Sequence, residues 1–190
     1  MAHQIYLTDG IILKKRDFGE ADRLFWIYTE KFGMIMASAK GVRLEKSKLR
    51  GNLDVFTFGD FAVISSKDFW RLVDAKETIS PKLNRSSAEQ TGLIGWQVKV
   101  FARTASLLAR MIKGEERNEE MWKQVKNLFL DLFDENIKKS ACRQAGKDLK
   151  DLEIKSIAAI LKTLGYMQEI PASGKVLISA INRAIKESML

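Results

Sequence analysis

Residues 24–40 read LFWIYTEKFGMIMASAK. Two short apolar runs flank Lys31-Phe32-Gly33, a typical turn, and predict one strand at Leu24–Thr29 and a second at Met34–Lys40. Similar runs predict three further strands, at Ile5–Lys15, Phe61–Ser66 and Trp70–Lys76. Five short strands within about 75 residues favour a small closed barrel, because closure hides the strand edges.

The pattern changes near Pro81, after which apolar residues recur at helical spacing. Ser87-Ala88-Glu89-Gln90 is a capping-box pattern, and the stripe that follows it predicts a helix ending near Lys113-Gly114. We expect further helices around Met121–Leu132, over Lys138–Lys150, over Leu152–Leu164 with a stop at Gly165, and after Gly174. The sequence therefore predicts a multi-domain α+β protein, with a barrel domain at 1–80 and an α-helical domain at 81–190.

Composition excludes several classes of activity. Cys142 and His3 are the only cysteine and histidine among 190 residues, too few for a zinc site, a Cys/His pair or a Ser/His/Asp triad. Gly174-Lys175 is followed by Val176, so no phosphate-binding P-loop is present. Neither an apolar run of about 18 residues nor a signal-peptide pattern occurs, and we expect a cytoplasmic protein without membrane association. We expect no catalytic residue, metal or cofactor.

Positive charge is concentrated in one stretch. The formal charge is +8, and between residues 40 and 50 five lysines and arginines face only Glu45, a local balance of +4. Such cations, with Ser47 and backbone amides, suit a phosphate backbone, and we expect them on a loop projecting from the barrel. A solvated surface loop explains the same pattern. Lys14, Lys15, Arg16 and Arg23 extend the surface if the first turn lies nearby.

Aromatic residues offer stacking surfaces for unpaired bases. Trp26, Tyr28, Phe69 and Trp70 are the candidates, and Trp70, next to Arg71 at a hairpin tip, is the one we expect to be exposed. A buried contact explains Trp26 better, and we expect Trp96 and Trp122 in the helical core. Asp17, Glu20 and Asp22 suggest a metal or acid–base site, but Arg16 and Arg23 beside them favour turn hydrogen bonds and ion pairs. Likewise, the acidic run at Glu115–Glu120 is typical of a solvated helix start.

Several further motifs occur in order along the chain: Asp17-Phe18-Gly19-Glu20-Ala21-Asp22-Arg23-Leu24, Tyr28-Thr29, Gly33, Ala39-Lys40-Gly41-Val42-Arg43, Lys46-Ser47-Lys48-Leu49, Glu116-Arg117-Asn118-Glu119, and Leu161 through Leu164-Gly165-Tyr166. In this order they resemble the RecO family of DNA repair and recombination mediators. The resemblance implies an OB-fold barrel followed by a helical domain. It also implies binding of single- and double-stranded DNA, strand annealing, and action with RecR and single-stranded-DNA-binding protein to load RecA, in association with the nucleoid.

One departure concerns zinc. Many family members carry zinc-finger cysteines after the Leu-Gly-Tyr segment, whereas here Met167-Gln168-Glu169-Ile170-Pro171 follows. We therefore expect a short form without the zinc finger. The predicted DNA-binding residues are Lys14, Arg16, Arg23, Lys40, Arg43, Lys46, Ser47, Lys48, Arg50, Trp70 and Arg71. Two alternatives remain: an adaptor that docks acidic tails of partner proteins without binding DNA, and an OB-fold RNA-binding protein.

Overall fold

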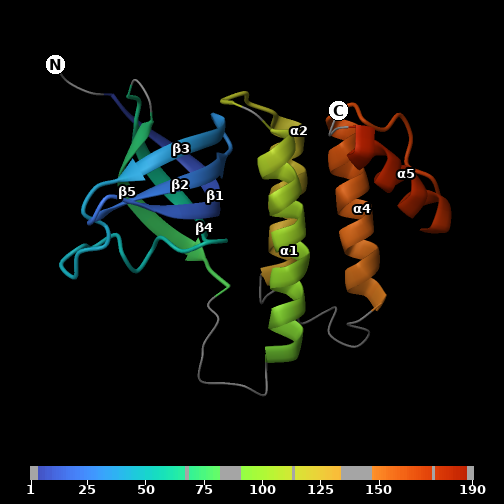
Figure 1. Ribbon diagram of the computed structural model, residues 1–190, viewed down its shortest axis with the longest axis horizontal. Helices are drawn as coiled ribbons and strands as arrows, with labels where there is room; N and C mark the ends of the chain where they lie inside the picture. The colour runs from blue at the N-terminus through green and yellow to red at the C-terminus, as the bar shows by residue number, and fades with distance from the viewer. Residues whose placement is uncertain are drawn as a thin grey trace. The chain divides into compact units, whose positions relative to one another are not determined.

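The computed structural model describes residues 4–66, 69–81, 91–112, 114–133, 147–172 and 174–187. The chain separates into two compact units, one formed by Met1–Leu83 with Ile112–Asn118 and the other by Asn84–Met111 with Glu119–Leu190. Figure 1 shows the strands of the first unit and the helices of the second. The segment 112–118 joins two helices in the sequence, yet it belongs to the barrel unit. The barrel unit therefore includes residues on both sides of the boundary placed between residues 80 and 81.

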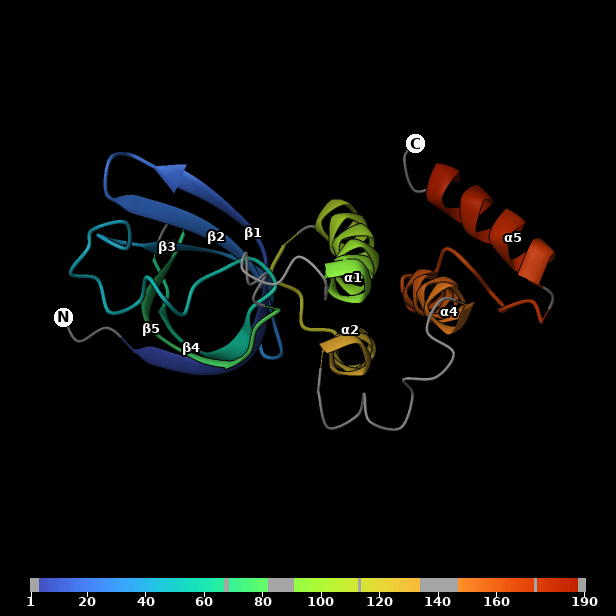
Figure 2. The ribbon, with the colours of Figure 1, turned by 90° about the horizontal axis from the view of Figure 1, so that it is seen from below.

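The first unit is a closed five-stranded barrel. Its strands are β1 (Ile5–Phe18), β2 (Asp22–Thr29), β3 (Gly33–Ala39), β4 (Phe58–Ile64) and β5 (Trp70–Ile79). They close in the order β1-β2-β3-β5-β4, with β1 antiparallel to both β2 and β4, and β3 parallel to β5. Figure 2 shows the strands curving around a common interior. The predicted barrel is confirmed as an OB-type fold.

Strand pairing moves several of the predicted strand ends. The pairs Asp17↔Arg23 and Phe18↔Asp22 extend β1 and β2 into the predicted first turn. Likewise, β4 begins at Phe58, three residues earlier than expected, because Phe58 pairs with Ile11 of β1. Cross-strand hydrogen bonds hold polar residues in a ladder as firmly as apolar ones. A strand end made of polar residues therefore cannot be recognised from the pattern of apolar residues.

The barrel interior is filled by alternate residues of the five strands. Ile12, Phe25, Ile27, Ile35, Phe61, Val63 and Leu72 are at most 3% exposed and form one cluster. Val42 and Leu53, from the segment between β3 and β4, belong to the same cluster. Two residues of that segment therefore contribute to the barrel core.

The second unit contains α1 (Thr91–Met111), α2 (Glu119–Phe133), α4 (Lys147–Thr163) and α5 (Gly174–Glu187). Ring contacts of Phe101 with Phe129 and Phe133 join α1 to α2. The Arg103–Glu153 ion pair, at 3.0 Å, joins α1 to α4. A buried apolar cluster, which includes Leu161, Leu177 and Ile181, joins α4 to α5. None of the helices in the described part of the chain is long and apolar enough to cross a bilayer.

Three predictions for the helical half need comment. The capping box at 87–90 and most of the helix predicted at 138–150 lie outside the described residues. Residues 147–150 continue directly into α4, so the prediction of a separate helix ending at Lys150 is wrong. Trp122 is buried as expected, but Trp96 is 39% exposed. Trp96 lies one position away from the buried stripe of α1 that includes Gln97 and Val100.

Candidate nucleic-acid interface

The segment between β3 and β4, residues 40–57, is the basic loop. It is a series of tight turns in which the backbone N–H of Leu44 donates to Gly41, that of Ser47 to Leu44 and that of Arg50 to Ser47. Val42 and Leu53 are 1% and 2% exposed. These two side chains anchor the loop on the barrel, and residues 43–52 between them are exposed or half-buried. Val42, Leu49 and Leu53 pack on the core, and the cations between them are left on the outer side.

The β1–β2 turn lies directly beside the start of this loop. Asp17 accepts a hydrogen bond from Nε of Arg23 at 2.7 Å, and Nε of Arg43 lies 3.7 Å from its other oxygen. The backbone N–H of Gly41 donates to Asp22 at 2.8 Å. The Arg23 hydrogen bond, with the charges of Arg23 and Arg43, lowers the pKa of Asp17. Turn hydrogen bonds and ion pairs therefore explain these carboxylates, as expected.

Metal binding finds no support in the described residues, where no group of three or more His, Cys, Asp or Glu side chains could hold a metal ion.

The basic side chains differ in how far they are already engaged. Lys15 is paired with Asp54 at 2.6 Å, and Arg23 and Arg43 share Asp17. Lys14 lies 4.9 Å from the ring centroid of the half-buried Trp26. The exposed cations Arg16 and Arg71 on the barrel strands, and Lys40, Lys46, Lys48 and Arg50 in the basic loop, have no carboxylate partner in the described part of the chain. Ser47 is half-buried among the loop cations.

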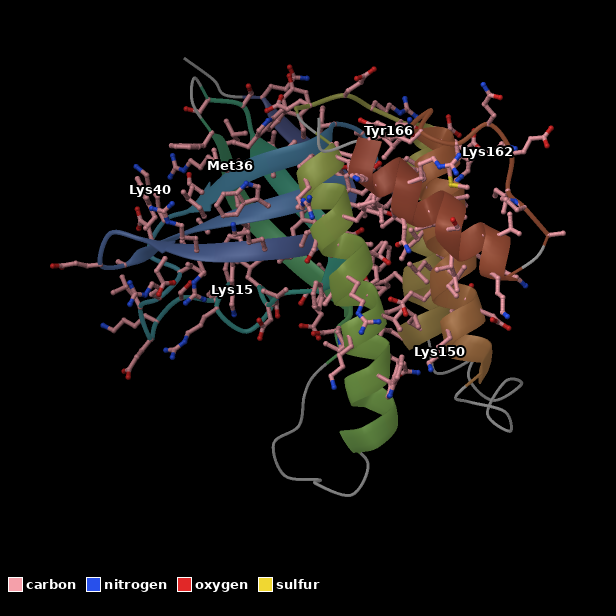
Figure 3. All side chains as sticks on the ribbon, turned by 45° about the vertical axis from the view of Figure 1, so that its right-hand side comes forward. Lys15, Met36, Lys40, Lys150, Lys162 and Tyr166 are labelled. Carbon is pink, nitrogen blue, oxygen red and sulfur yellow. The ribbon has the colours of Figure 1, made fainter. Side chains whose placement is uncertain are left out.

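A groove of about 720 Å³ opens on the barrel at the start of the basic loop. Three parts of the fold line it: the β1–β2 turn, the end of β3, and the ends of β4 and β5. Its lining residues are Phe18, Asp22, Ser38, Lys40, Ile64, Ser65, Ser66, Phe69 and Arg71. Figure 3 shows Lys40 at the end of the barrel that carries the β1–β2 turn. Lys40 and Arg71, which are 31 positions apart in the sequence, thus share one groove.

Trp70 does not take part in this groove. It is 8% exposed, and its indole N–H donates to a carboxylate oxygen of Glu115 at 2.6 Å. Its ring packs against those of Tyr6 and Phe32, with centroid distances of 5.7 and 4.8 Å. The prediction of an exposed Trp70 is wrong, because its ring belongs to the barrel core and the 112–118 segment provides the acceptor for its N–H. Glu115, expected in a solvated helix start, is that acceptor.

Phe18 is the aromatic lining residue that the sequence reasoning missed, and that reasoning also missed Ser38, Ile64, Ser65 and Ser66. Phe18 is 47% exposed, and its ring lies edge-on to Phe69 at a centroid distance of 6.3 Å. The available signal was one aromatic residue within the polar run between Arg16 and Asp22. Of the other stacking candidates, Tyr28 is buried.

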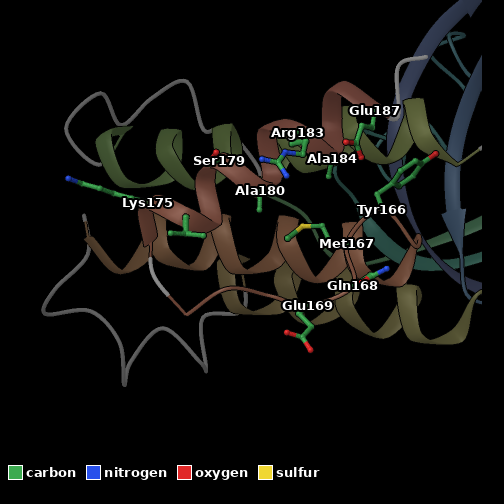
Figure 4. Close-up of a pocket in the computed structure, with 11 residues that line it drawn as sticks. Tyr166, Met167, Gln168, Glu169, Lys175, Ser179, Ala180, Arg183, Ala184 and Glu187 are labelled. Carbon is green, nitrogen blue, oxygen red and sulfur yellow. The ribbon is translucent and has the colours of Figure 1, made fainter.

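A second pocket, of about 480 Å³, lies within the helical unit. Figure 4 shows that it is lined by the segment 166–169, which follows α4, and by α5. Lys175 and Arg183 bring positive charge to this pocket, and Glu169 and Glu187 balance it. Because its charges balance, this pocket does not select a polyanion, whereas the barrel groove and the basic loop carry excess positive charge.

Comparison with known proteins points to the same part of the chain, the barrel with its groove and basic loop. A family model described as "Recombination protein O N terminal" matches residues 1–77, which is nearly the whole barrel. DNA repair protein RecO of Clostridium perfringens is 32% identical over 118 residues, covering 62% of this chain and 45% of the relative. That of a Synechococcus species is 33% identical over 158 residues, covering 76% and 50%.

The chain thus spans about half or less of the length of the curated relatives it matches. The matched region contains the strand pattern, the β1–β2 turn and the basic loop that carried the resemblance in the sequence. On this evidence residues 1–77 of the chain match the N-terminal domain of the RecO family.

Proposed function

We propose that the protein is a non-catalytic DNA-binding mediator of DNA repair and homologous recombination. The observation that carries this proposal is the basic loop, which presents Lys40, Lys46, Lys48 and Arg50 without carboxylate partners in the described structure. Relatives that share this barrel are named DNA repair proteins. Cations that are already free need no ion pair to break before they meet a phosphate.

The loop is also held in a fixed shape before any DNA is bound. Val42 and Leu53 are buried in the barrel core, and Arg43 is held at Asp17. A preformed loop loses less conformational entropy on binding than a flexible one, so more of the electrostatic attraction remains as affinity. The contacts are with phosphates, and we therefore expect binding to single and double strands with little sequence preference.

Strand annealing follows from the same chemistry. Two complementary strands repel one another through their phosphates, and a protein that neutralises both lowers this barrier without forming or breaking a covalent bond. A protein that acts in this way needs no catalytic residues. In the cell we propose that the protein anneals strands at the nucleoid and acts with RecR and single-stranded-DNA-binding protein to load RecA.

A salt series tests the role of the loop. If the four free loop cations and Arg71 each contact a phosphate, the slope of log affinity against log salt on a single strand is about −3.5. The variant Lys46→Gln plus Lys48→Gln then has a slope of about −2.1. The matched control is Lys175→Gln plus Lys186→Gln, which removes the same charge from two exposed positions on α5.

Binding of a fluorescent oligonucleotide is measured by anisotropy at several salt concentrations for the wild type and both variants. We expect the loop variant alone to lose slope. Equal slopes for the wild type and the loop variant would remove the loop from the interface. A stronger affinity for RNA than for DNA of the same sequence would favour the RNA-binding alternative, and no binding to either would favour a protein adaptor.

A further inference from the structure

The barrel groove has a composition that phosphate binding does not require. We propose that it is a subsite for an unpaired nucleobase, with Phe18 as the stacking platform, so that the barrel distinguishes single strands from blunt duplex. This inference rests on the proposed function, because it assigns a part of the DNA ligand to one part of the same unit.

The aromatic pair is the first argument. Phe18 leaves 47% of its surface exposed, although a phenyl ring gains free energy from burial. Phe69 contacts it at 6.3 Å with a 64° angle between the rings, which supports the ring of Phe18 and leaves part of it open. An open aromatic ring with a supporting neighbour is the arrangement on which unpaired bases stack.

The polar lining is the second argument. Lys40 and Arg71 bring two positive charges to the groove, and Asp22 brings one negative charge. An oxygen of Asp22 already accepts the N–H of Gly41, so this carboxylate is engaged by the protein itself. The hydroxyls of Ser38, Ser65 and Ser66 add donors and acceptors. A nucleotide has parts that match this lining: an apolar ring face for the aromatic ring, polar base edges for the hydroxyls, and an anionic phosphate for the two cations.

The size and origin of the groove agree with this ligand. Its volume of about 720 Å³ lies within the roughly 300–1,000 Å³ typical of small-molecule sites. The strand register brings its parts together, since Ser38 of β3 is the parallel partner of Arg71 on β5. Phe18 comes from the end of β1, and the pair Phe18↔Asp22 holds it beside the groove.

Duplex DNA meets this groove differently. In a duplex the base faces are stacked on one another and only the phosphates and groove edges are exposed. A blunt duplex therefore uses the cations but not Phe18. A single strand uses both, and each stacked base raises its affinity by about 5- to 150-fold.

Three DNA probes separate these contributions: an oligothymidylate of about 30 nucleotides, an abasic strand of the same length, and a blunt duplex. The variant Phe18→Ser removes the platform, and Phe18→Trp keeps one. Tyr166→Ser is the matched control, because Tyr166 is a 39% exposed aromatic residue of the helical unit.

We expect the wild type to bind oligothymidylate at least about 5-fold more tightly than the abasic strand. Phe18→Ser should abolish this difference and leave the salt slope and the duplex affinity unchanged. Phe18→Trp should retain it, with indole fluorescence quenched by oligothymidylate and not by the abasic strand.

The inference is overturned if the wild type binds the ordinary and abasic strands equally, or if Phe18→Ser weakens all three probes alike. Urea unfolding of each variant shows whether an equal loss reflects a damaged fold, and in that case the Phe18→Trp fluorescence decides. These outcomes differ from a failure of the proposed function, in which no probe binds or the loop variant keeps its salt slope.

Discussion

Asp17 holds two of the cations that the basic surface could otherwise offer to DNA. Arg23 and Arg43 both lie on its carboxylate, at 2.7 and 3.7 Å, and their side chains are 22% and 36% exposed. Replacing Asp17 with Asn removes the negative charge and keeps the size of the side chain. We predict that Asp17→Asn binds DNA more tightly than the wild type, which is an unusual result for a change in a predicted interface.

The magnitude follows from the number of cations released. Each additional phosphate contact steepens the salt slope on a single strand by about 0.7. Arg43 also donates to the carbonyl oxygen of Gly19 at 3.1 Å, so it stays in place when Asp17 is neutralised. One or two released cations therefore steepen the slope by about 0.7–1.4, and a fourfold rise in salt then weakens binding by an additional about 2.6- to 7-fold.

Anisotropy titrations at several salt concentrations provide the assay. Asp60→Asn is the matched control, because Asp60 is an exposed β4 residue with no ion pair in the described part of the chain. Both variants raise the net charge by one, but only Asp17→Asn releases arginines. Stability should change little, since exposed ion pairs contribute little to folding. If the two variants have the same salt slope, Asp17 does not restrain Arg23 and Arg43, and this interpretation of the β1–β2 turn is refuted.

Two further predictions concern stability. Gly33 has a φ of 66°, and an added Cβ would overlap the carbonyl oxygen of Glu116. Gly33→Ala should therefore destabilise the barrel unit by more than the about 1–3 kcal/mol of the backbone strain alone, whereas Gly19→Ala, with a φ of 64° and open space around it, should show only the strain. Equal urea midpoints for the two variants would exclude a close approach of Glu116. Burial raises the pKa of Asp54, but hydrogen bonds from Lys15 and from the backbone N–H of Val55 outweigh it and hold this pKa below its ordinary value of 3.8. The stability that Asp54 contributes is thus complete above about pH 4 and is lost as the pH falls through the lowered pKa. Asp54→Asn should lose less stability than the wild type between pH 5 and 2 in urea unfolding, and identical acid profiles would contradict the Lys15–Asp54 pair.

The local pattern of apolar and turn residues was sufficient to predict the strands of the barrel and their order along the chain. Alternation and turn residues such as Lys31-Phe32-Gly33 predicted five strands, because side chains on a strand alternate between the core and the solvent. The strand ends were harder to predict. Asp17 and Asp22 lie in the β1–β2 ladder although they are polar, because pairing with Arg23 and Phe18 depends on the partner strand.

Solvent exposure was the property that the sequence predicted least well. Trp70 and Phe18 are both aromatic residues next to turns, yet the first is buried under Glu115 and the second is open. The ring of Trp70 packs in the barrel core against Tyr6 and Phe32, and its N–H meets Glu115, which lies more than 40 positions further along the chain. No local pattern contains that information.

The sequence by itself determined the barrel, the helical half, the concentration of charge at residues 40–50 and the family that the barrel matches. These depend on composition and on spacing between neighbours in the chain. Only the tertiary structure decided which cations are free, since Arg23 and Arg43 meet Asp17 through the loop that Val42 and Leu53 hold on the barrel. It also decided that Phe18, Lys40 and Arg71 line one groove. The physical reason is that electrostatic pairing and burial depend on distance in space, and barrel closure brings together residues that are far apart in the sequence.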